Sequence, residues 1–386
     1  MEQQPIYADN AATTSLSETA FQAMKPYFTE YYGNPSNIYS LGRQAKRALE
    51  TARETVADCL GAQPSEIFFT SCGSESDNWA IKGAAAIGAR QGRKRIVTTE
   101  IEHHAVLNAC RTLEQHGFTV ARVGVRADGI VRTKDVKTAA LPDTALVSVM
   151  TANNEIGTIQ PVAEIGSFCR EHGVLFHTDA VQAAGHLPIA VNELHADLLS
   201  LSGHKFHGPK GIGVLYVRRG VTLENLIDGG AQERGRRAGT ENVAGAVGLA
   251  AALRECCGHR EETAARLTVL RDRLMDGMLK IPGSRLNGDP AKRLPGSVNV
   301  SFENADGETL VLLLDEAGIC ASSGSACTAG SSDPSHVLLA LGLPRELARG
   351  SLRVTLGDRN TEADVERILS VLPGAVEKAR ALDRPS

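Results

Sequence analysis

Two side chains at the ends of apolar stretches dominate the chemistry that this chain could perform. Residues 174–176 form an apolar stretch that leads to Asp179, and residues 197–201 form another that leads to Lys205. Each pattern predicts a buried strand that ends in one functional side chain. A pyridoxal 5'-phosphate site needs such a pair: the amine forms a Schiff base with the aldehyde, and the carboxylate keeps the ring nitrogen protonated.

A second lysine, Lys210, competes for the Schiff-base role. It lies in the turn at residues 207–211, which is typical of an exposed loop lysine. Lys205 directly follows an apolar strand, where partial burial lowers the pKa of the amine and supplies its free base. We therefore predict Lys205 as the Schiff-base lysine. Taken alone, Asp179 would more often be a cap at a strand end.

A turn at residues 70–76 joins a predicted strand to a predicted helix. Such a turn directs free backbone N–H groups at an anion, and the Ser74 hydroxyl, next to Gly73, adds a donor. The alternative is an ordinary helix cap, with Ser74 followed by acidic residues. The pair of Asp179 and Lys205 favours the phosphate site.

Three polar residues, Glu102, His103 and His104, follow the strand predicted at residues 95–99. The two histidines could suggest a metal, but no carboxylate or thiol spacing supports a metal site. An imidazole at this strand end could stack on a flat ring and shuttle protons near neutral pH. We choose His103 because it is nearer the strand.

Further polar residues stand near other strand ends. Asn154, after the strand predicted at 145–150, reads as a turn residue or as an amide donor to the cofactor or substrate. Gln182 is placed for a similar role. Arg353 lies in an apolar strand pattern at 351–356, where a charge needs a partner. A substrate carboxylate held by two hydrogen bonds would be such a partner.

Composition limits the class of protein. The chain has 386 residues, 42% of them hydrophobic, and a net charge of −4. These values predict a two-domain enzyme with no electrostatic signature for nucleic acid or membrane. The first residues lack the features of a signal peptide, so we expect a cytoplasmic protein. The eight cysteines contain no Cys-x-x-Cys pair, which predicts mostly free thiols rather than a zinc or cluster site.

The pattern of elements predicts an α/β fold. Strands at 66–70, 95–99, 118–125 and 145–150 alternate with helices at 41–60, 74–90, 105–116 and 161–172. Such alternation is typical of a mostly parallel sheet covered by helices. We predict a large domain at 16–255 and a small α+β domain formed by 1–15 with 256–386. A helical stretch at 240–279 should break near Gly258.

Several motifs together resemble those of the cysteine desulfurases, which have the class V aminotransferase fold. The motifs are YADNAATT at 7–14, TDAVQ at 178–182, SGHK at 202–205, RAGTEN at 237–242 and SSGSACT at 322–328. The likeness covers nearly the whole chain. It implies an aspartate-aminotransferase-like, pyridoxal-phosphate-dependent transferase fold.

The resemblance also implies residue roles. Lys205 would form the Schiff base, Asp179 would hold the pyridine nitrogen and His103 would stack on the ring. Further cofactor contacts would come from Gly73, Ser74, Asn154, Gln182, Ser202 and His204. Thr240 would reach the phosphate of a neighbouring subunit, which implies a homodimer. The implied substrate-binding residues are Asn10, Asn154 and Arg353, and the implied sulfur-accepting nucleophile is Cys327.

The implied reaction removes sulfur from L-cysteine. Arg353 would bind the carboxylate, Lys205 would remove the Cα proton, and Cys327 would accept the sulfur as a persulfide, leaving L-alanine. An iron–sulfur scaffold protein would then take the sulfur, with Cys327 contacting a cluster at most transiently. An unperturbed thiol is only about 3% thiolate at pH 7. A base must therefore take its proton, and our hypothesis is His103.

The resemblance leaves alternatives open. The sequence around Cys72 and the segment 232–237 look more like the nitrogen-fixation (NifS) branch than the housekeeping (IscS) branch. A selenocysteine lyase shares the fold and could use the same cysteine. A simple aminotransferase of this fold would leave Cys327 unexplained, and a non-enzymatic sulfur carrier would need neither Lys205 nor Asp179.

Overall fold

A seven-stranded sheet forms the centre of the larger part of the molecule. In this computed structural model, which describes residues 5–323 and 333–382, the strand order is β2-β8-β7-β6-β5-β3-β4. Strand β8 runs antiparallel to its neighbours β7 and β2, and the other pairs are parallel. The strands are β2 (Ile67–Thr70), β3 (Arg95–Thr99), β4 (Thr119–Val123), β5 (Thr144–Ser148), β6 (Leu175–Asp179), β7 (Leu198–Ser202) and β8 (Gly213–Val217). The predicted mostly parallel sheet is confirmed.

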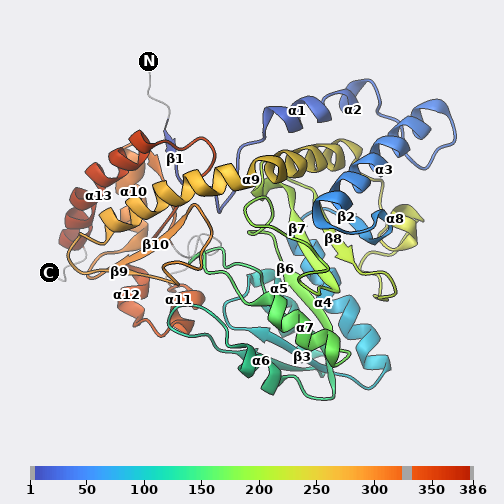
Figure 1. Ribbon diagram of the computed structural model, residues 1–386, viewed down its shortest axis with the longest axis horizontal. Coiled ribbons are helices and arrows are strands. Elements are labelled where there is room, and N and C mark those ends of the chain that lie inside the picture. The colour runs from blue at the N-terminus through green and yellow to red at the C-terminus, as the bar shows by residue number, and fades with distance from the viewer. Residues whose placement is uncertain (1–4, 324–332, 383–386) are drawn as a thin grey trace.

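Helices cover both faces of this sheet (Figure 1). Side chains alternate along a strand, so Leu198 of β7 packs beneath α4 while Leu199 and Leu201 pack towards α3 and α9. The helices around the sheet are α1 (Glu18–Met24), α2 (Pro26–Thr29), α3 (Ser40–Leu60), α4 (Gly73–Arg90), α5 (His104–Gln115), α6 (Thr133–Ala139), α7 (Val162–Glu171) and α8 (Gln232–Gly235). Two short 3₁₀ helices complete this part, η1 (Pro64–Glu66) and η2 (Gly203–Lys205). The helices and strands predicted here agree with the structure to within a few residues.

A smaller antiparallel sheet, of order β12-β10-β9, has its own hydrophobic core. Its strands are β9 (Ser284–Leu286), β10 (Ser297–Phe302) and β12 (Ser351–Thr355), and β1 (Ile6–Tyr7) pairs with β11 (Ile319–Cys320) beside it. The helices here are α10 (Gly307–Glu316), α11 (His336–Ala340), α12 (Arg345–Arg349) and α13 (Glu362–Leu382). The boundaries of the two domains remain a proposal.

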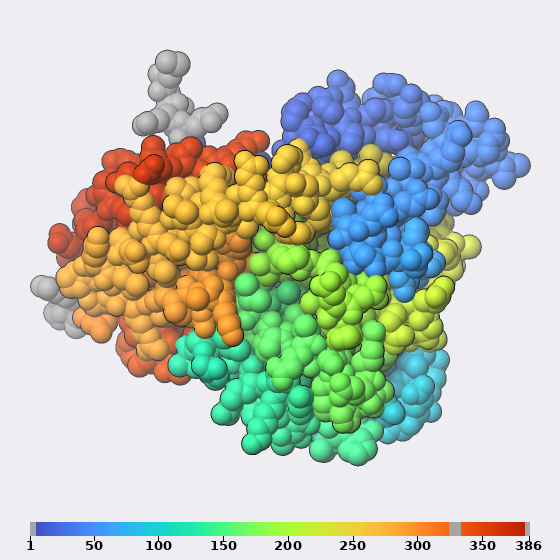
Figure 2. All heavy atoms as spheres, in the orientation of Figure 1, coloured from blue at the N-terminus to red at the C-terminus, as the bar shows by residue number. Residues whose placement is uncertain are grey.

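One long helix, α9 (Val243–Met278), joins the two parts. The gold helix crosses the molecule from the orange and red elements to the blue ones, and the spheres in Figure 2 show it as a continuous band on this face. The break expected near Gly258 was wrong. A Cβ at Gly258 would meet no atom within 4 Å, so the helix surface is open at this point. An interior glycine costs a helix only about 1 kcal/mol.

The N-terminal segment also connects the two parts. Ala8 accepts a hydrogen bond from the backbone N–H of Thr355 in β12, and the backbone N–H of Thr14 donates to the carbonyl of His204. The segment therefore passes from the small sheet to the turn that carries Lys205. No helix in the described part of the chain is long and apolar enough to cross a membrane.

Candidate active site

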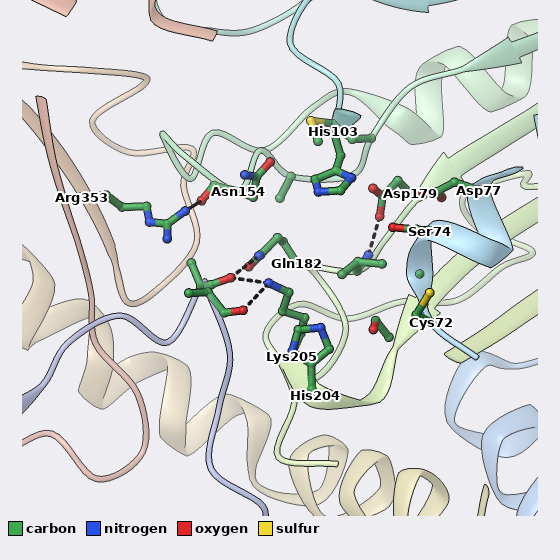
Figure 3. A pocket seen from close by; sticks show the side chains of 17 residues that line it. Cys72, Ser74, Asp77, His103, Asn154, Asp179, Gln182, His204, Lys205 and Arg353 are labelled. Carbon is green, nitrogen blue, oxygen red and sulfur yellow. Dashed lines mark hydrogen bonds between the residues drawn. The ribbon is translucent and has the colours of Figure 1, made fainter. Parts of the chain in front are cut away.

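The carboxyl ends of β6 and β7 bring Asp179 and Lys205 to one pocket. Asp179 is the last residue of β6, its Cα partner in the parallel neighbour β7 is Ser200, and Lys205 ends the 3₁₀ turn that follows β7. The pocket has a volume of about 340 Å³ (Figure 3). Ligands of open α/β sheets commonly bind at the carboxyl ends of the strands. The site lies where such a ligand is expected.

Lys205 is held by the N-terminal segment. Its Nζ donates to the carbonyl of Ala11 over 2.5 Å and to that of Ala12 over 2.8 Å. Gln182 Nε2 also donates to Ala11, over 2.8 Å. The amine of Lys205 and the amide of Gln182 therefore donate to the same carbonyl, that of Ala11, at the edge of the pocket.

Asp179 is a buried carboxylate with one backbone donor. Its Oδ1 accepts the N–H of Val181 over 2.9 Å. Burial raises the pKa of Asp179 to about 6, and the Val181 N–H and the Lys205 cation limit that rise. Asp179 is consequently an anion at neutral pH, although less strongly so than an exposed aspartate.

His103 caps helix α5 from the rim of the pocket. Its Nδ1 accepts the N–H of Ala105 over 3.1 Å. Burial first, and then the Lys205 cation and His104, lower the pKa of His103 to about 4. The neutral ring accepts at Nδ1 and therefore carries its proton on Nε2. The ring therefore offers a hydrogen-bond donor at Nε2, and its lowered pKa makes it a weak base for a thiol.

The predicted phosphate turn forms the start of α4. The helix begins at Gly73, and Cys72 before it makes no side-chain capping bond. Ser74 is thus inside the first turn, not at the capping position. A Cβ on Gly73 would lie 2.8 Å from Val181 Cγ2, so only glycine allows this approach between helix and strand end. Figure 3 shows the Ser74 hydroxyl directed towards the pocket.

Arg353, in the centre of β12, enters the pocket from the small sheet. It is 3% exposed; its Nη1 donates to the carbonyl of Asn154 over 3.0 Å and its Nη2 to Asp9 Oδ1 over 2.8 Å. Its Nε is buried and makes no hydrogen bond within the described part of the chain. A buried guanidinium with an unused donor is suited to a carboxylate ligand.

The structure brings together most of the predicted site residues. The lining of the pocket includes Gly73, Ser74, His103, Asn154, Asp179, Gln182, Ser202, His204, Lys205 and Arg353. Asn10 is not in this lining: its amide donates to the carbonyl of Thr355 over 2.8 Å, beside β12. Thr240 is exposed on the segment before α9, outside the pocket. Cys327 lies outside the described residues.

Among the polar lining residues, two were not assigned a role in the site from the sequence, Cys72 and Asp77. Asp77 could have been found from helical periodicity. It stands three and four residues before Ala80 and Ile81, which are fully buried on the core-facing side of α4. An aspartate in an apolar stripe requires an explanation.

The pocket fits pyridoxal phosphate by size and by its donors. Its volume lies in the range of small-molecule sites. It offers an amine at Lys205, a carboxylate at Asp179 and an uncapped helix start at Gly73. These are the groups that the aldehyde, the ring nitrogen and the phosphate each need. No cluster of metal-ligating side chains occurs among residues 5–323 and 333–382.

Comparison with known proteins agrees with this site. The family "Aminotransferase class-V" matches residues 6–368. A "Cysteine desulfurase IscS" from Methanosarcina thermophila is 54% identical over 98% of this chain and 94% of its own length. Among solved structures, a "NifS-like protein" has a TM-score of 0.91 and 40% identity, covering 97% of this chain and all of its own. "SspA in complex with cysteine" has a TM-score of 0.81 and 39% identity, covering 91% and 98%. The chain therefore belongs to the class V aminotransferase family and, within it, to the pyridoxal-phosphate-dependent cysteine desulfurases.

Proposed function

We propose that this enzyme removes sulfur from L-cysteine, releasing L-alanine and leaving the sulfur as a persulfide on Cys327. The observation that carries the proposal is the convergence of Lys205, Asp179 and Arg353 on one pocket. An α-amino acid substrate requires a cation for its carboxylate and an amine for proton transfer. The cofactor requires an anion at its ring nitrogen. A related protein has been solved in complex with cysteine, which supports this substrate.

Lys205 moves the proton in this mechanism. Bound pyridoxal phosphate supplies an aldehyde that condenses with amines and a ring that withdraws electrons from the substrate Cα. Lys205 would take the Cα proton at Nζ and pass it to the cofactor-bound substrate before the sulfur is attacked, which returns Nζ to the neutral amine. The thiol proton of Cys327 would then move through Nζ to the substrate Cβ as the C–S bond breaks and the S–S bond forms. The carbonyls of Ala11 and Ala12 orient Nζ by accepting its protons.

Asp179 and His103 set the charges around the cofactor. Asp179 holds a proton on the ring nitrogen through its buried carboxylate. His103 would stack on the ring and, as a neutral imidazole with its proton on Nε2, offers a hydrogen-bond donor and is only a weak base. The base for the Cys327 thiol is then a different group, and Lys205 as a free amine is our choice.

Arg353 orients the substrate. Its guanidinium already lies against Asn154 and Asp9, so its position is fixed before the ligand arrives. A substrate carboxylate bound by Arg353 would hold the substrate in the pocket that Lys205 also lines. We keep Asn10 as a further substrate contact, since it neighbours β12, from which Arg353 extends.

The partner for Thr240 is a second copy of the chain. Exposed Thr240 lies outside the pocket of its own chain, so a contact with a phosphate needs another subunit. The segment 21–39 also exposes large apolar side chains, with Phe28 62% and Ile38 88% exposed. Figure 2 shows this blue region as a lobe that projects from the body. Together these features support a homodimer.

The sulfur acceptor, the branch of the family and the cellular location complete the proposal. An iron–sulfur scaffold protein as sulfur acceptor follows from the family resemblance, and so does the NifS-like branch with a role in nitrogen fixation. A cytoplasmic location is supported by the free thiols of the seven cysteines in the described residues.

The central experiment combines two variants of the cofactor-loaded enzyme. The wild type should be yellow and should produce L-alanine and, with a reductant, sulfide from L-cysteine. Lys205→Ala should lose the visible absorbance of the Schiff base and fall at least about 100-fold in rate. Cys327→Ala should keep the absorbance and lose sulfide release, whereas the matched Cys320→Ala should keep both.

Each alternative gives a different result. Desulfuration by Cys327→Ala at the wild-type rate would contradict the persulfide assignment. A keto-acid product in place of L-alanine would identify an aminotransferase. A larger kcat/KM for L-selenocysteine than for L-cysteine would identify a selenocysteine lyase.

A further inference from the structure

Asp77 is a buried carboxyl in the pocket that the proposed mechanism does not use. It lies on α4, is 1% exposed and lines the same cavity as Asp179. Figure 3 places it beside Asp179, on the side away from Lys205. Its Oδ1 has no hydrogen-bond partner within the described residues, which is costly for a charged oxygen.

The groups that face Asp77 from β6 and β7 supply no positive charge. Its Oδ1 is 3.6 Å from His177 Nε2, too far for a hydrogen bond. His177 instead contacts Ser148 Oγ over 2.8 Å and Ser200 Oγ over 3.0 Å. Burial lowers the pKa of His177 to about 3, so it is neutral and supplies no cation.

The two carboxyls share one face of the sheet. His177 and Asp179 are two residues apart in β6, so both side chains point towards α4, where Asp77 lies. Ser200 is opposite Asp179 in β7 and contacts the Asp77 carboxyl. The titratable groups that act on Asp77 besides His177 are Asp179, Glu102 and Cys72. Each of them, when ionised, would repel a negative charge on Asp77.

Two adjacent buried carboxylates cannot both ionise cheaply, so one keeps a proton. Asp179 has the Val181 N–H at 2.9 Å and the nearby Lys205 cation, which both stabilise its anion. The groups that face the Asp77 carboxyl are the hydroxyl of Ser200 and the imidazole of His177, and both are neutral. Burial and the Asp179 charge raise the pKa of Asp77 well above its ordinary value.

We propose that Asp77 is a positioning residue that stays protonated as a neutral carboxylic acid and thereby confines the negative charge of the pair to Asp179. This inference rests on the proposed role of Asp179 at the cofactor ring nitrogen. An ionised Asp77 would share the ring-nitrogen proton or draw it away from the Asp179 side. A neutral Asp77 fills the buried site and leaves one anion, at the position where the ring nitrogen is held.

The test observes the proton directly, by infrared difference spectroscopy of the apoprotein at pH 8. Wild type minus Asp77→Asn should show the carbonyl stretch of a protonated carboxyl. In Asp179→Asn the same band should titrate at lower pH than in the wild type, because the neighbouring charge is gone. A carboxylate band in place of the acid band would overturn the proposal. An acid band that titrates at the same pH in Asp179→Asn as in the wild type would also overturn it.

A second measurement is the affinity for pyridoxal phosphate, and a further variant serves if Asp77→Asn does not fold. Pyridoxal phosphate affinity should change less than about threefold in Asp77→Asn and fall at least tenfold in Asp179→Asn; a tenfold fall in both would show that Asp77 is an anion. If Asp77→Asn does not fold, the acid band should shift in frequency in Ser200→Ala, and an unshifted band would contradict the assignment to Asp77. A wild type that binds no cofactor would defeat the proposed function alone, since the band is read without cofactor.

Discussion

Burial acts on His103 and Asp179 in opposite directions, and this difference separates their roles. A buried site disfavours the charged form of any group. The pKa of His103 falls to about 4, and the pKa of Asp179 rises to about 6. At neutral pH the pocket therefore contains a neutral imidazole beside an anionic carboxylate. The Val181 N–H and the Lys205 cation keep Asp179 on the ionised side.

This charge state predicts how cofactor binding depends on pH. Asp179 is an anion above its folded pKa of about 6 and gains a proton as the pH falls through that value. Below it, pyridoxal phosphate affinity should weaken by up to about tenfold per pH unit. In Asp179→Asn, the dependence of pyridoxal phosphate affinity on pH reflects the titration of the cofactor alone. The difference between the wild-type profile and this profile therefore gives the contribution of Asp179. Parallel profiles would show that Asp179 does not titrate in this range.

The Arg353 guanidinium predicts a defect in substrate binding. Arg353→Ala leaves the substrate carboxylate without its cation, and KM for L-cysteine should rise about 30-fold or more. The loss should appear mainly in KM, because binding of the carboxylate is equal in the ground and transition states. Steady-state kinetics test this, with exposed Arg90→Ala as the control that keeps KM. A fall in kcat at constant KM would assign Arg353 to another step.

At the scale of elements, a buried ion pair fixes the segment that leads to Thr240. Arg53 of α3 donates from Nη1 and Nη2 to the two oxygens of Glu233 in α8, each over 2.8 Å. Glu233 Oε2 also accepts the N–H of Phe69 in β2, over 2.9 Å. Glu233 has a φ of 43°, so its backbone is strained and depends on these contacts. Arg237, further along, pairs with Glu75 in the first turn of α4 over 2.7 Å.

Removal of one partner from this pair should be strongly destabilising. Glu233→Ala leaves Arg53 buried and unpaired, at a cost of about 3–5 kcal/mol in the free energy of unfolding. Urea denaturation measures this cost. Glu224→Ala, in an exposed pair with Arg90, should cost less than about 1 kcal/mol. The double variant Arg53→Met, Glu233→Leu should recover part of the loss, and an equal loss in Glu224→Ala would contradict the argument.

At the scale of the molecule, the site is assembled from segments that are distant in sequence. Arg353 comes from the small sheet, while Lys205 and Asp179 come from the large one. Helix α9 and the N-terminal segment connect the two parts. The relative placement of the parts therefore decides whether substrate and cofactor groups meet.

The exposed apolar side chains of segment 21–39 predict the oligomeric state. Ile38→Asp places a charge in the proposed dimer interface, so light scattering after gel filtration should report the mass of one chain instead of two. Leu312→Asp, on α10 and also exposed, is the control that should remain dimeric. A wild-type monomer, or an Ile38→Asp dimer, would show that this surface is not the interface.

Local patterns along the chain predicted much of the fold. The alternation of apolar and helical periods located the strands and helices of the large sheet, because burial on one or both faces imposes those periods. Lys205 and Asp179 were found by their place after apolar stretches. Gly258 led to the wrong prediction, because a helix that is packed at both ends, over 243–253 and 267–278, tolerates one glycine between them.

The sequence alone determined which groups were available: an amine, a carboxylate, an imidazole and an arginine, each next to a structural signal. Only the tertiary structure decided their states. The proton position on His103 depends on the Ala105 N–H, and the importance of Asp77 depends on its position against Asp179 across a helix–sheet contact. Distances and burial between elements set these properties, and the order of residues in a chain does not encode them locally.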